Sequence, residues 1–187
     1  SVRKFLGVPD GGFLYTNAAI HRSLPRSESR DRASHLFGRL ERTASDYFSV
    51  RKFNDEAVGN EPLMLMSNLT KTMIGKINLD EVKAKREENY RILEEALRSV
   101  NSLNLKQPIA PFAYPLLVED GPKMRKAFAE KGVYIPTLWP NVLQDSDEKS
   151  VAYHYAADIL PLPCDQRYSY GEMERIVDLL REFGIIS

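Results

Sequence analysis

The longest helical pattern in this chain begins at Asn78, and it is the strongest constraint on the fold. Asn78 is a good N-cap, and Glu81 lies three residues later, as in a capping box. Glu87 and Arg91 are spaced as an i,i+4 ion pair on a solvated face. An apolar stripe runs to about residue 101 and consists of Leu79, Val82, Leu93, Ala96, Leu97 and Val100. The pattern predicts one long amphipathic helix.

Two further helical patterns precede this helix. Residues 27–59 carry apolar side chains at three- and four-residue steps, with a predicted break near Asn54. Another helix is predicted to open at Pro62 and to stop at Gly75. The apolar positions are Leu36, Phe37, Leu40, Ala44, Tyr47 and Phe48 in the first pattern, and Leu63, Met66, Leu69, Met73 and Ile74 in the second.

The C-terminal part mixes short strands with helices. The predicted strands are 112–118, 133–135 and 159–162. Residues 136–158, with Trp139 and several acids, indicate an irregular stretch. Strands and helices at this spacing predict an α+β fold, with helices on one face of a small antiparallel sheet. We therefore expect two parts, residues 1–75 and residues 76–187.

Two helices of this C-terminal part have clear end signals. The first starts after Asp120 and is closed by Gly132. The second has Ser169 as N-cap, Glu172 at the capping-box position and Gly184 as its stop. Its predicted apolar face consists of Met173, Ile176, Val177, Leu180 and Phe183.

Composition excludes several classes of protein. The chain has 187 residues, and 26 Lys+Arg balance 26 Asp+Glu, which argues against a nucleic-acid partner. One cysteine, Cys164, cannot form an internal disulfide, so a reducing compartment is expected. No apolar run approaches the ~18 residues of a membrane span, and no signal-peptide h-region is present. We expect a soluble cytoplasmic protein.

Lys4 is the most informative residue for function. It precedes an acidic-Gly-Gly turn at 10–12, which leads into a predicted strand over 12–16 and a polar connection ending near Pro25. A lysine can form a Schiff base with an aldehyde cofactor, and a neighbouring positive charge such as Arg3 can lower its pKa. The glycines allow a close backbone approach. The competing interpretation is a surface lysine before a hairpin-like turn.

Other candidate sites are weaker. The three histidines, His21, His35 and His154, lack metal-ligand spacing, so we expect no metal site. Cys164 has no nearby histidine in the sequence and is interpreted as a buried small residue. Residues 165–167 are expected to form a turn and cap region rather than an active pair.

Several stretches together resemble the DegT/StrS-like family of pyridoxal 5′-phosphate (PLP)-dependent sugar aminotransferases, which have fold-type I. Lys4 and the turn at 10–12 fall at the offsets of the family's cofactor lysine and its Gly-Glu-Gly-Gly-like turn. Residues 66–70 resemble its Met-Ser helix, and 85–93 resemble the Arg-x-x-Asn-Tyr-x-x-Leu segment of its interdomain helix. Its C-terminal domain is similar to residues 134–140 and 159–169.

The resemblance implies which domains of the family's enzymes this chain corresponds to. In that family a large N-terminal domain holds the parallel sheet, the aspartate facing the pyridine nitrogen and most phosphate contacts, all before the lysine. Only three residues precede Lys4 here. The resemblance therefore assigns residues 1–75 to the lysine loop and tail of the large domain, and 76–187 to the interdomain helix and small C-terminal domain. Lys4 would be the Schiff-base lysine of an enzyme of sugar biosynthesis, acting on a nucleotide-linked keto-sugar.

The same resemblance bears on partners and further residues. It implies a homodimer, or completion by a separate N-terminal segment, and the chain alone is expected to be inactive. Asn60 matches the position of a family asparagine that reaches the cofactor phosphate of the neighbouring subunit; a simple turn asparagine is the alternative. Trp139 stands where the family often has a histidine, and we expect it to fill the core rather than to pack under a sugar.

A second functional hypothesis is a non-catalytic module. The small domain and its long helices would then serve as an oligomerisation or partner-binding surface. In either case, the helices at 27–74 are expected to leave apolar faces exposed or domain-swapped, and thus to self-associate.

Overall fold

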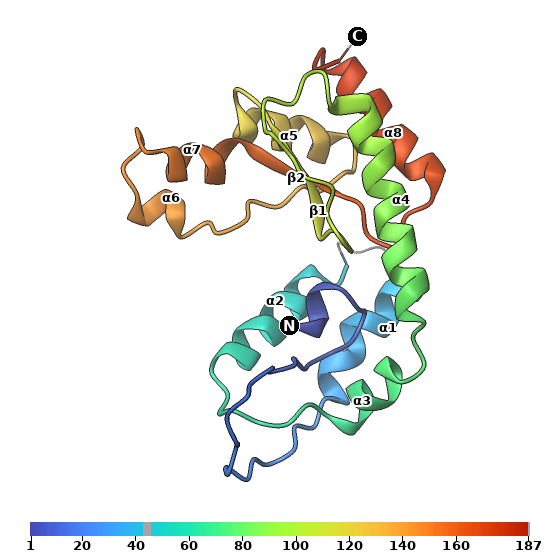
Figure 1. Cartoon of the computed structure of the whole chain (residues 1–187), viewed down its shortest axis with the longest axis vertical. Coiled ribbons are helices and arrows are strands. Elements are labelled where there is room, and N and C mark those ends of the chain that lie inside the picture. Colours follow the sequence, from blue (N-terminus) through green and yellow to red (C-terminus); the bar gives the residue numbers. More distant parts are fainter. Residues whose placement is uncertain (43–45, 187) are drawn as a thin grey trace. The chain divides into compact units, whose positions relative to one another are not determined.

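The chain forms two compact units, Ser1–Ile77 and Asn78–Ser187, which we call the N-terminal and the C-terminal unit. The structure is a computed structural model that describes residues 1–42 and 46–186 (Figure 1). The boundary expected after Gly75 lies two residues before the observed division. The class is α+β, as predicted, with one two-stranded antiparallel sheet among the described residues.

The N-terminal unit consists of helices and turns. Its elements are the 3-10 helices Val2–Lys4 (η1) and Asp31–Ala33 (η2) and the α-helices Ser34–Glu41 (α1), Phe48–Gly59 (α2) and Asn68–Ile74 (α3). A parallel bridge joins Arg26 to Leu65. Among residues whose burial is described, its buried hydrophobic side chains are those of Leu6, Val8 and Ala33.

The helix breaks of this unit differ from the predicted ones. Helix α1 ends at Glu41 and α2 begins at Phe48, whereas Asn54 is inside α2 and donates from Nδ2 to the Arg32 carbonyl at 3.2 Å. Ala44 and the side chains of Leu40 and Phe48 lie outside the described residues.

The start of α3 was also predicted wrongly, although its end at Gly75 is confirmed. The helix begins at Asn68 and not at Pro62, because the Ser67 hydroxyl caps it by accepting from the Thr70 amide at 3.1 Å.

The strand predicted over 12–16 is wrong, since these residues form a loop. Phe13, Leu14 and Tyr15 are 61%, 77% and 92% exposed. An apolar run becomes a strand only where a partner strand completes its hydrogen bonds, and no described segment pairs with this one.

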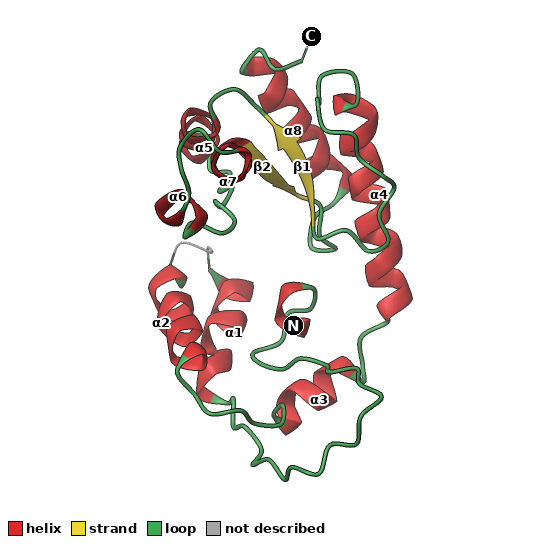
Figure 2. Cartoon of the chain, turned by 60° about the vertical axis from the view of Figure 1, so that its left-hand side comes forward, coloured by secondary structure: helices red, strands yellow, loops and turns green. Residues whose placement is uncertain are grey.

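The sheet of the C-terminal unit pairs β1 (Ala113–Leu117) with β2 (Ile159–Pro163), both predicted (Figure 2). Its register sets Tyr114 opposite Leu162 and Leu116 opposite Leu160. Directly opposed residues and residues two apart share a face, so these four fully buried side chains form one apolar surface.

Helices complete this core. They are α4 (Leu79–Leu97), α5 (Gly121–Glu130), α6 (Val142–Asp145), α7 (Val151–Asp158) and α8 (Tyr170–Glu182). Leu93 and Leu97 of α4, Phe128 of α5, and Met173 and Leu180 of α8 are buried in the same cluster as the four strand residues.

The cap signals of α4, α5 and α8 are confirmed. Asn78 Oδ1 accepts from the Asp80 and Glu81 amides at 3.2 and 3.3 Å. Glu172 completes the capping box by accepting from the Ser169 amide at 2.7 Å. Gly132 and Gly184 both have positive φ at the helix ends, as C-terminal glycines commonly do.

Two strand and loop predictions of this unit are wrong. Residues 133–135 form a loop, in which the Val133 amide bonds the Phe128 carbonyl at 2.9 Å and Ile135 is buried without a strand partner. Residues 136–158 are not irregular throughout, because they contain α6 and α7. Ser150 starts α7 by accepting from the Tyr153 amide at 3.1 Å.

The predicted Glu87–Arg91 pair is also not formed. Arg91 Nε lies 3.9 Å from Glu95 Oε1, and Glu87 Oε1 accepts from the Ala110 amide at 3.2 Å. In the part of the chain that the structure describes, no helix combines the length and apolar composition that a membrane crossing requires.

We predict that Gly121→Ala destabilises the C-terminal unit by about 1–3 kcal/mol, because overpacking forces backbone shifts. A Cβ at Gly121 would lie 2.1 Å from the Ala157 carbonyl oxygen and 2.7 Å from Asp158 Cα. Urea unfolding followed by circular dichroism measures the change.

The matched control is Gly171→Ala, whose added Cβ has its nearest neighbour at 4.0 Å. This variant should be neutral or stabilised by up to about 1 kcal/mol, because alanine favours helix. Equal stability of the two variants would contradict the close approach at Gly121.

Candidate functional site

Lys4 is the last residue of η1 and its side chain is exposed. The turn continues through the Leu6 amide, which donates to the Val2 carbonyl at 2.8 Å. Leu6 and Val8 are buried and hold this loop on the N-terminal unit. Within the described residues no side chain forms an ion pair with the Lys4 ammonium. The structure thus presents an accessible primary amine on a turn secured by buried apolar side chains.

Arg3, expected to act on Lys4 as a neighbouring positive charge, is itself paired. Its guanidinium forms an ion pair with Asp55 of α2, and Arg51 Nε lies 3.7 Å from the same carboxylate. Because the carboxylate offsets the guanidinium charge, Arg3 is not the unpaired positive neighbour that the sequence predicted. The pair also ties η1 to α2.

The acidic-Gly-Gly turn packs onto the start of α3. Gly11 has φ of +100°, and a Cβ there would lie 3.1 Å from Met66 Cβ and 3.2 Å from Thr70 Cγ2. Asp10 is buried and accepts from Ser67. Two stretches that carry the family resemblance, residues 10–12 and 66–70, therefore meet in the structure.

Asn60 lies at the C-terminal end of α2 and is exposed. Its Nδ2 donates to the Glu56 carbonyl at 3.1 Å, and its amide donates to the Ala57 carbonyl. This side chain satisfies the end of a helix, and no hydrogen bond among the described residues joins it to Lys4. The predicted contact of Asn60 with the cofactor phosphate of a neighbouring subunit stays a prediction, and the exposed position of its side chain leaves it accessible.

The Arg-x-x-Asn-Tyr-x-x-Leu segment of α4 is buried. Arg86 donates to the Pro111 carbonyl at 2.7 Å and to Gln166 Oε1 at 2.8 Å. Asn89 Nδ2 donates to the Asp165 and Tyr168 carbonyls, each at 3.1 Å. The segment thus fixes the turn that follows β2, so two further stretches of the resemblance meet within the C-terminal unit.

Residues 165–167 form a turn, as predicted. Arg167 binds Asp165 with two hydrogen bonds of 2.7 and 2.8 Å. Burial raises the pKa of Asp165, but the bonds and charge of Arg167 outweigh this and leave it below its usual value. Burial also lowers the pKa of Arg86, which Asp165 partly opposes.

Trp139 does not fill the core, contrary to prediction. It has φ of +52° and is 67% exposed. Its carbonyl accepts from the Val142 amide at 2.9 Å, so it belongs to the turn that starts α6. The backbone requirement of this turn, and not burial, sets where the indole lies.

The histidines are dispersed. His35 Nδ1 lies 3.1 Å from Asn54 Nδ2, and His154 Nδ1 lies 3.6 Å from Asp158 Oδ2. Within residues 1–42 and 46–186, no group of three or more His, Cys, Asp or Glu side chains could hold a metal ion.

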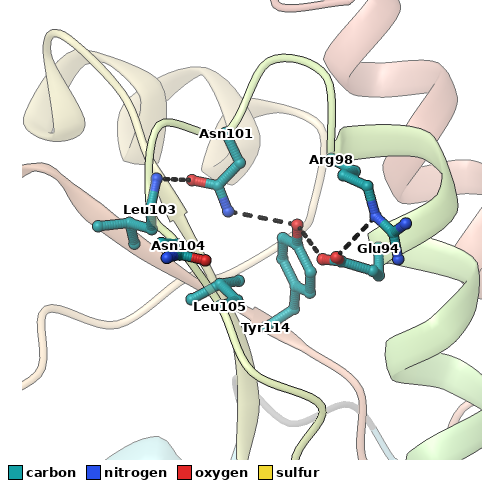
Figure 3. A pocket seen from close by; sticks show the side chains of 7 residues that line it. All are labelled: Glu94, Arg98, Asn101, Leu103, Asn104, Leu105 and Tyr114. Carbon is teal, nitrogen blue, oxygen red and sulfur yellow. Dashed lines mark hydrogen bonds and ion pairs between the residues drawn. The ribbon is translucent and has the colours of Figure 1, made fainter.

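A pocket of about 310 Å³ lies where α4 ends and β1 runs past it (Figure 3), and sequence reasoning missed it. Tyr114 donates to Glu94 Oε2 at 2.9 Å and accepts from Asn101 at 3.2 Å. Arg98 Nε donates to Glu94 Oε1 at 3.1 Å. Burial raises the pKa of Tyr114, which keeps its hydroxyl a donor.

The side chains of Glu94, Asn101 and Tyr114 in this pocket already bond one another or their neighbours. Both Glu94 oxygens are occupied, and Asn101 Oδ1 accepts from the Leu103 and Leu117 amides at 3.3 Å. A ligand that reached Glu94, Asn101 or Tyr114 would displace existing bonds. The network fastens residues 98–105 to the sheet, and we assign it a structural role.

Comparisons with protein-family models, with curated proteins and with solved structures find no match to this chain. The assignment of a function therefore depends on the residues and contacts described above.

Cys164 is buried in the core of the C-terminal unit, as predicted. Burial raises its pKa to about 12, although Arg86 opposes the shift. An unfolded thiol has a pKa of about 8.5, so the unfolded state loses its proton first. The stability that this thiol contributes is complete below about pH 8.5 and is lost as pH rises toward 12.

We predict that wild type loses stability relative to Cys164→Ala by about 1.4 kcal/mol per pH unit above about pH 9. Urea unfolding of both proteins at pH 7, 9 and 10 measures the difference between their free energies of unfolding. Groups other than Cys164 titrate in both proteins, so their effects cancel in this difference. A difference that stays constant with pH would show that the thiol ionises freely in the fold.

Proposed function

We propose that this chain is the C-terminal part of a DegT/StrS-like PLP-dependent aminotransferase that acts on a nucleotide-linked keto-sugar, with Lys4 as the lysine that carries the cofactor. The observation that supports this most is the exposed Lys4 amine on a loop held by an acidic-Gly-Gly turn. In both units, separate stretches that carry the resemblance contact each other.

The residues present fit one part of a PLP site. The accessible Lys4 amine suits covalent attachment to an aldehyde, and Lys4 Nζ would then move a proton to or from the reacting carbon. When bound, PLP supplies an electron sink that a protonated pyridine nitrogen strengthens. We assign no described residue to the pyridine nitrogen, and within one chain none to the phosphate; Asn60 would contact the phosphate of a neighbouring subunit.

We therefore propose that these contacts come from residues outside this chain, in a second copy of it or in a complementing N-terminal segment. The chain alone would then hold the aldehyde without orienting the ring, and transamination by it would be very slow.

The exposed apolar side chains of the N-terminal unit support this proposal. They include Phe13, Leu14, Tyr15, Ile20, Phe37, Phe53 and Leu63. A segment that normally packs on a larger domain would leave such side chains uncovered when that domain is not part of the chain.

We predict that adding PLP to the chain produces the absorbance of lysine-bound cofactor near ~400–430 nm, and that Lys4→Ala removes most of it. Borohydride reduction followed by peptide mass spectrometry should place the label on Lys4.

The matched control is Lys76→Ala, which removes an exposed lysine of the same unit and should keep the full signal. Wild-type folding without a PLP spectrum, or equal signal loss in both variants, would refute Lys4 as the cofactor lysine.

The second candidate function, a non-catalytic oligomerisation or partner-binding domain, is favoured by the same apolar exposure. Phe13, Leu14 and Tyr15 are consecutive and exposed, as at many binding surfaces. A chain that self-associates through these residues and gives no PLP spectrum would support this function over the enzyme.

We predict that the chain self-associates at micromolar concentration and that the double variant Phe13→Ser/Leu14→Ser weakens association at least about tenfold, because apolar burial drives it. Sedimentation velocity over a concentration series measures the effect. A compact monomer at all concentrations would rule out association through this surface.

A further inference from the structure

Asp10 is a buried carboxylate with a complete set of donors. It accepts from the Ser67 amide at 3.1 Å, from the Ser67 hydroxyl at 3.1 Å and from the Thr70 hydroxyl. Only 5% of the residue is exposed. A buried carboxylate is tolerated when such bonds replace its hydration, so these donors fix where Asp10 lies.

The hydroxyl of Ser67 has each of its hydrogen-bonding positions filled. It donates its one proton to Asp10 and accepts from Ser29 Oγ at 2.6 Å and from the Thr70 amide at 3.1 Å. A hydroxyl has one donor and two acceptor sites, so the set is closed. Because the Ser67 hydroxyl is saturated and the Ser67 amide is a donor, the group beside them must be an acceptor such as the Asp10 carboxylate. A donor placed there would have no partner.

This closed network is linked to Lys4 by the backbone. The residue after Asp10 is Gly11, whose carbonyl accepts from the Val2 amide at 3.3 Å. Val2 begins the 3-10 turn that ends at Lys4. Gly11 is also enclosed sterically, since a Cβ there would lie 3.3 Å from Val2 Cγ2 and 3.1 Å from Met66 Cβ.

A second contact holds the other side of the turn. Arg3 pairs with Asp55, so η1 is connected to α2 as well as to the start of α3. The turn is thus held through Val2 and through Arg3, whereas the Lys4 side chain itself stays exposed.

We propose that Asp10 is a positioning residue for Lys4: its buried carboxylate, locked by Ser67 and Thr70, holds the turn at 2–11 so that the Lys4 amine is presented in one place. The proposal rests on Lys4 being the cofactor lysine of the proposed function, and it assigns to Asp10 a role that acts through the backbone of Gly11 and Val2.

Hydrogen exchange of the full chain tests the proposal without any cofactor. Asp10→Asn sets an amide donor against the Ser67 amide and should raise exchange over residues 2–11 about tenfold. Thr70→Val removes one donor, nearly preserves side-chain shape and should raise it less. Asp31→Asn, at an exposed carboxylate of the same unit, should change nothing.

Two further measurements follow the amine itself. An amine-directed ester, added in limiting amount, modifies both Lys4 and Lys76 in the same sample, so Lys76 serves as the reference. Asp10→Asn should change the rate of modification at Lys4, relative to Lys76, at least about twofold. The PLP concentration that half-saturates the Lys4-dependent absorbance should rise about tenfold in Asp10→Asn and stay unchanged in Asp31→Asn.

The outcomes separate the two claims. Faster exchange at 2–11 with an altered Lys4 rate supports positioning by Asp10 even if wild type never binds PLP, in which case the proposed function fails alone. Unchanged exchange and Lys4 rate overturn the positioning role even if wild type binds PLP. Equal loosening of 2–11, α1 and α2 in both Asp10→Asn and Thr70→Val also overturns it, because Asp10 would then only hold the unit folded.

Discussion

The antiparallel register of β1 and β2 is the constraint on which the C-terminal unit depends. It places Tyr114 and Leu116 beside Leu162 and Leu160, so both strands contribute to one apolar surface. Shifting the register by one residue would turn these side chains to the other face. The buried residues of α4, α5 and α8 have a place to pack only because this surface exists.

The N-terminal unit is organised on a different physical basis. Its described interior has few apolar side chains, and a closed set of hydrogen bonds around Asp10 joins residues 10, 29, 67 and 70. Such bonds are directional, so they specify position more sharply than apolar contacts do. If Lys4 carries a cofactor, as proposed, these directional bonds give its loop the defined position that such a role requires.

The sequence predicted well those features that depend on neighbouring residues. The caps at Asn78, Ser169 and Ser67 involve groups two or three residues away. The sequence predicts the first two as caps, but it places the start of the third helix at Pro62 instead of after Ser67. The strands at 12–16 and 133–135 failed because a strand needs a partner that a local apolar run does not identify.

The candidate site shows the same limit. Lys4 and the acidic-Gly-Gly turn can be read from the sequence, and the charge of Arg3 was expected to act on its neighbour. The partner of Arg3 is Asp55, 52 residues away, and the donors to Asp10 lie 57 and 60 residues away. No local pattern predicts contacts of this separation, although residues 66–70, which carry part of the family resemblance, include the residues that bind Asp10.

The length of these separations has a consequence for how the chain acquires its structure. The Asp10–Thr70 contact closes a loop of 60 residues, and the entropy of that closure must be lost before any of its hydrogen bonds forms. The 19-residue helix α4, by contrast, can start from its own cap. The packing of the C-terminal unit requires closures at least as long, since Arg86 of α4 donates to Gln166, 80 residues later. We therefore expect α4 to form early, and the loop that carries Lys4 to become ordered only once Asp10 has reached Ser67 and Thr70.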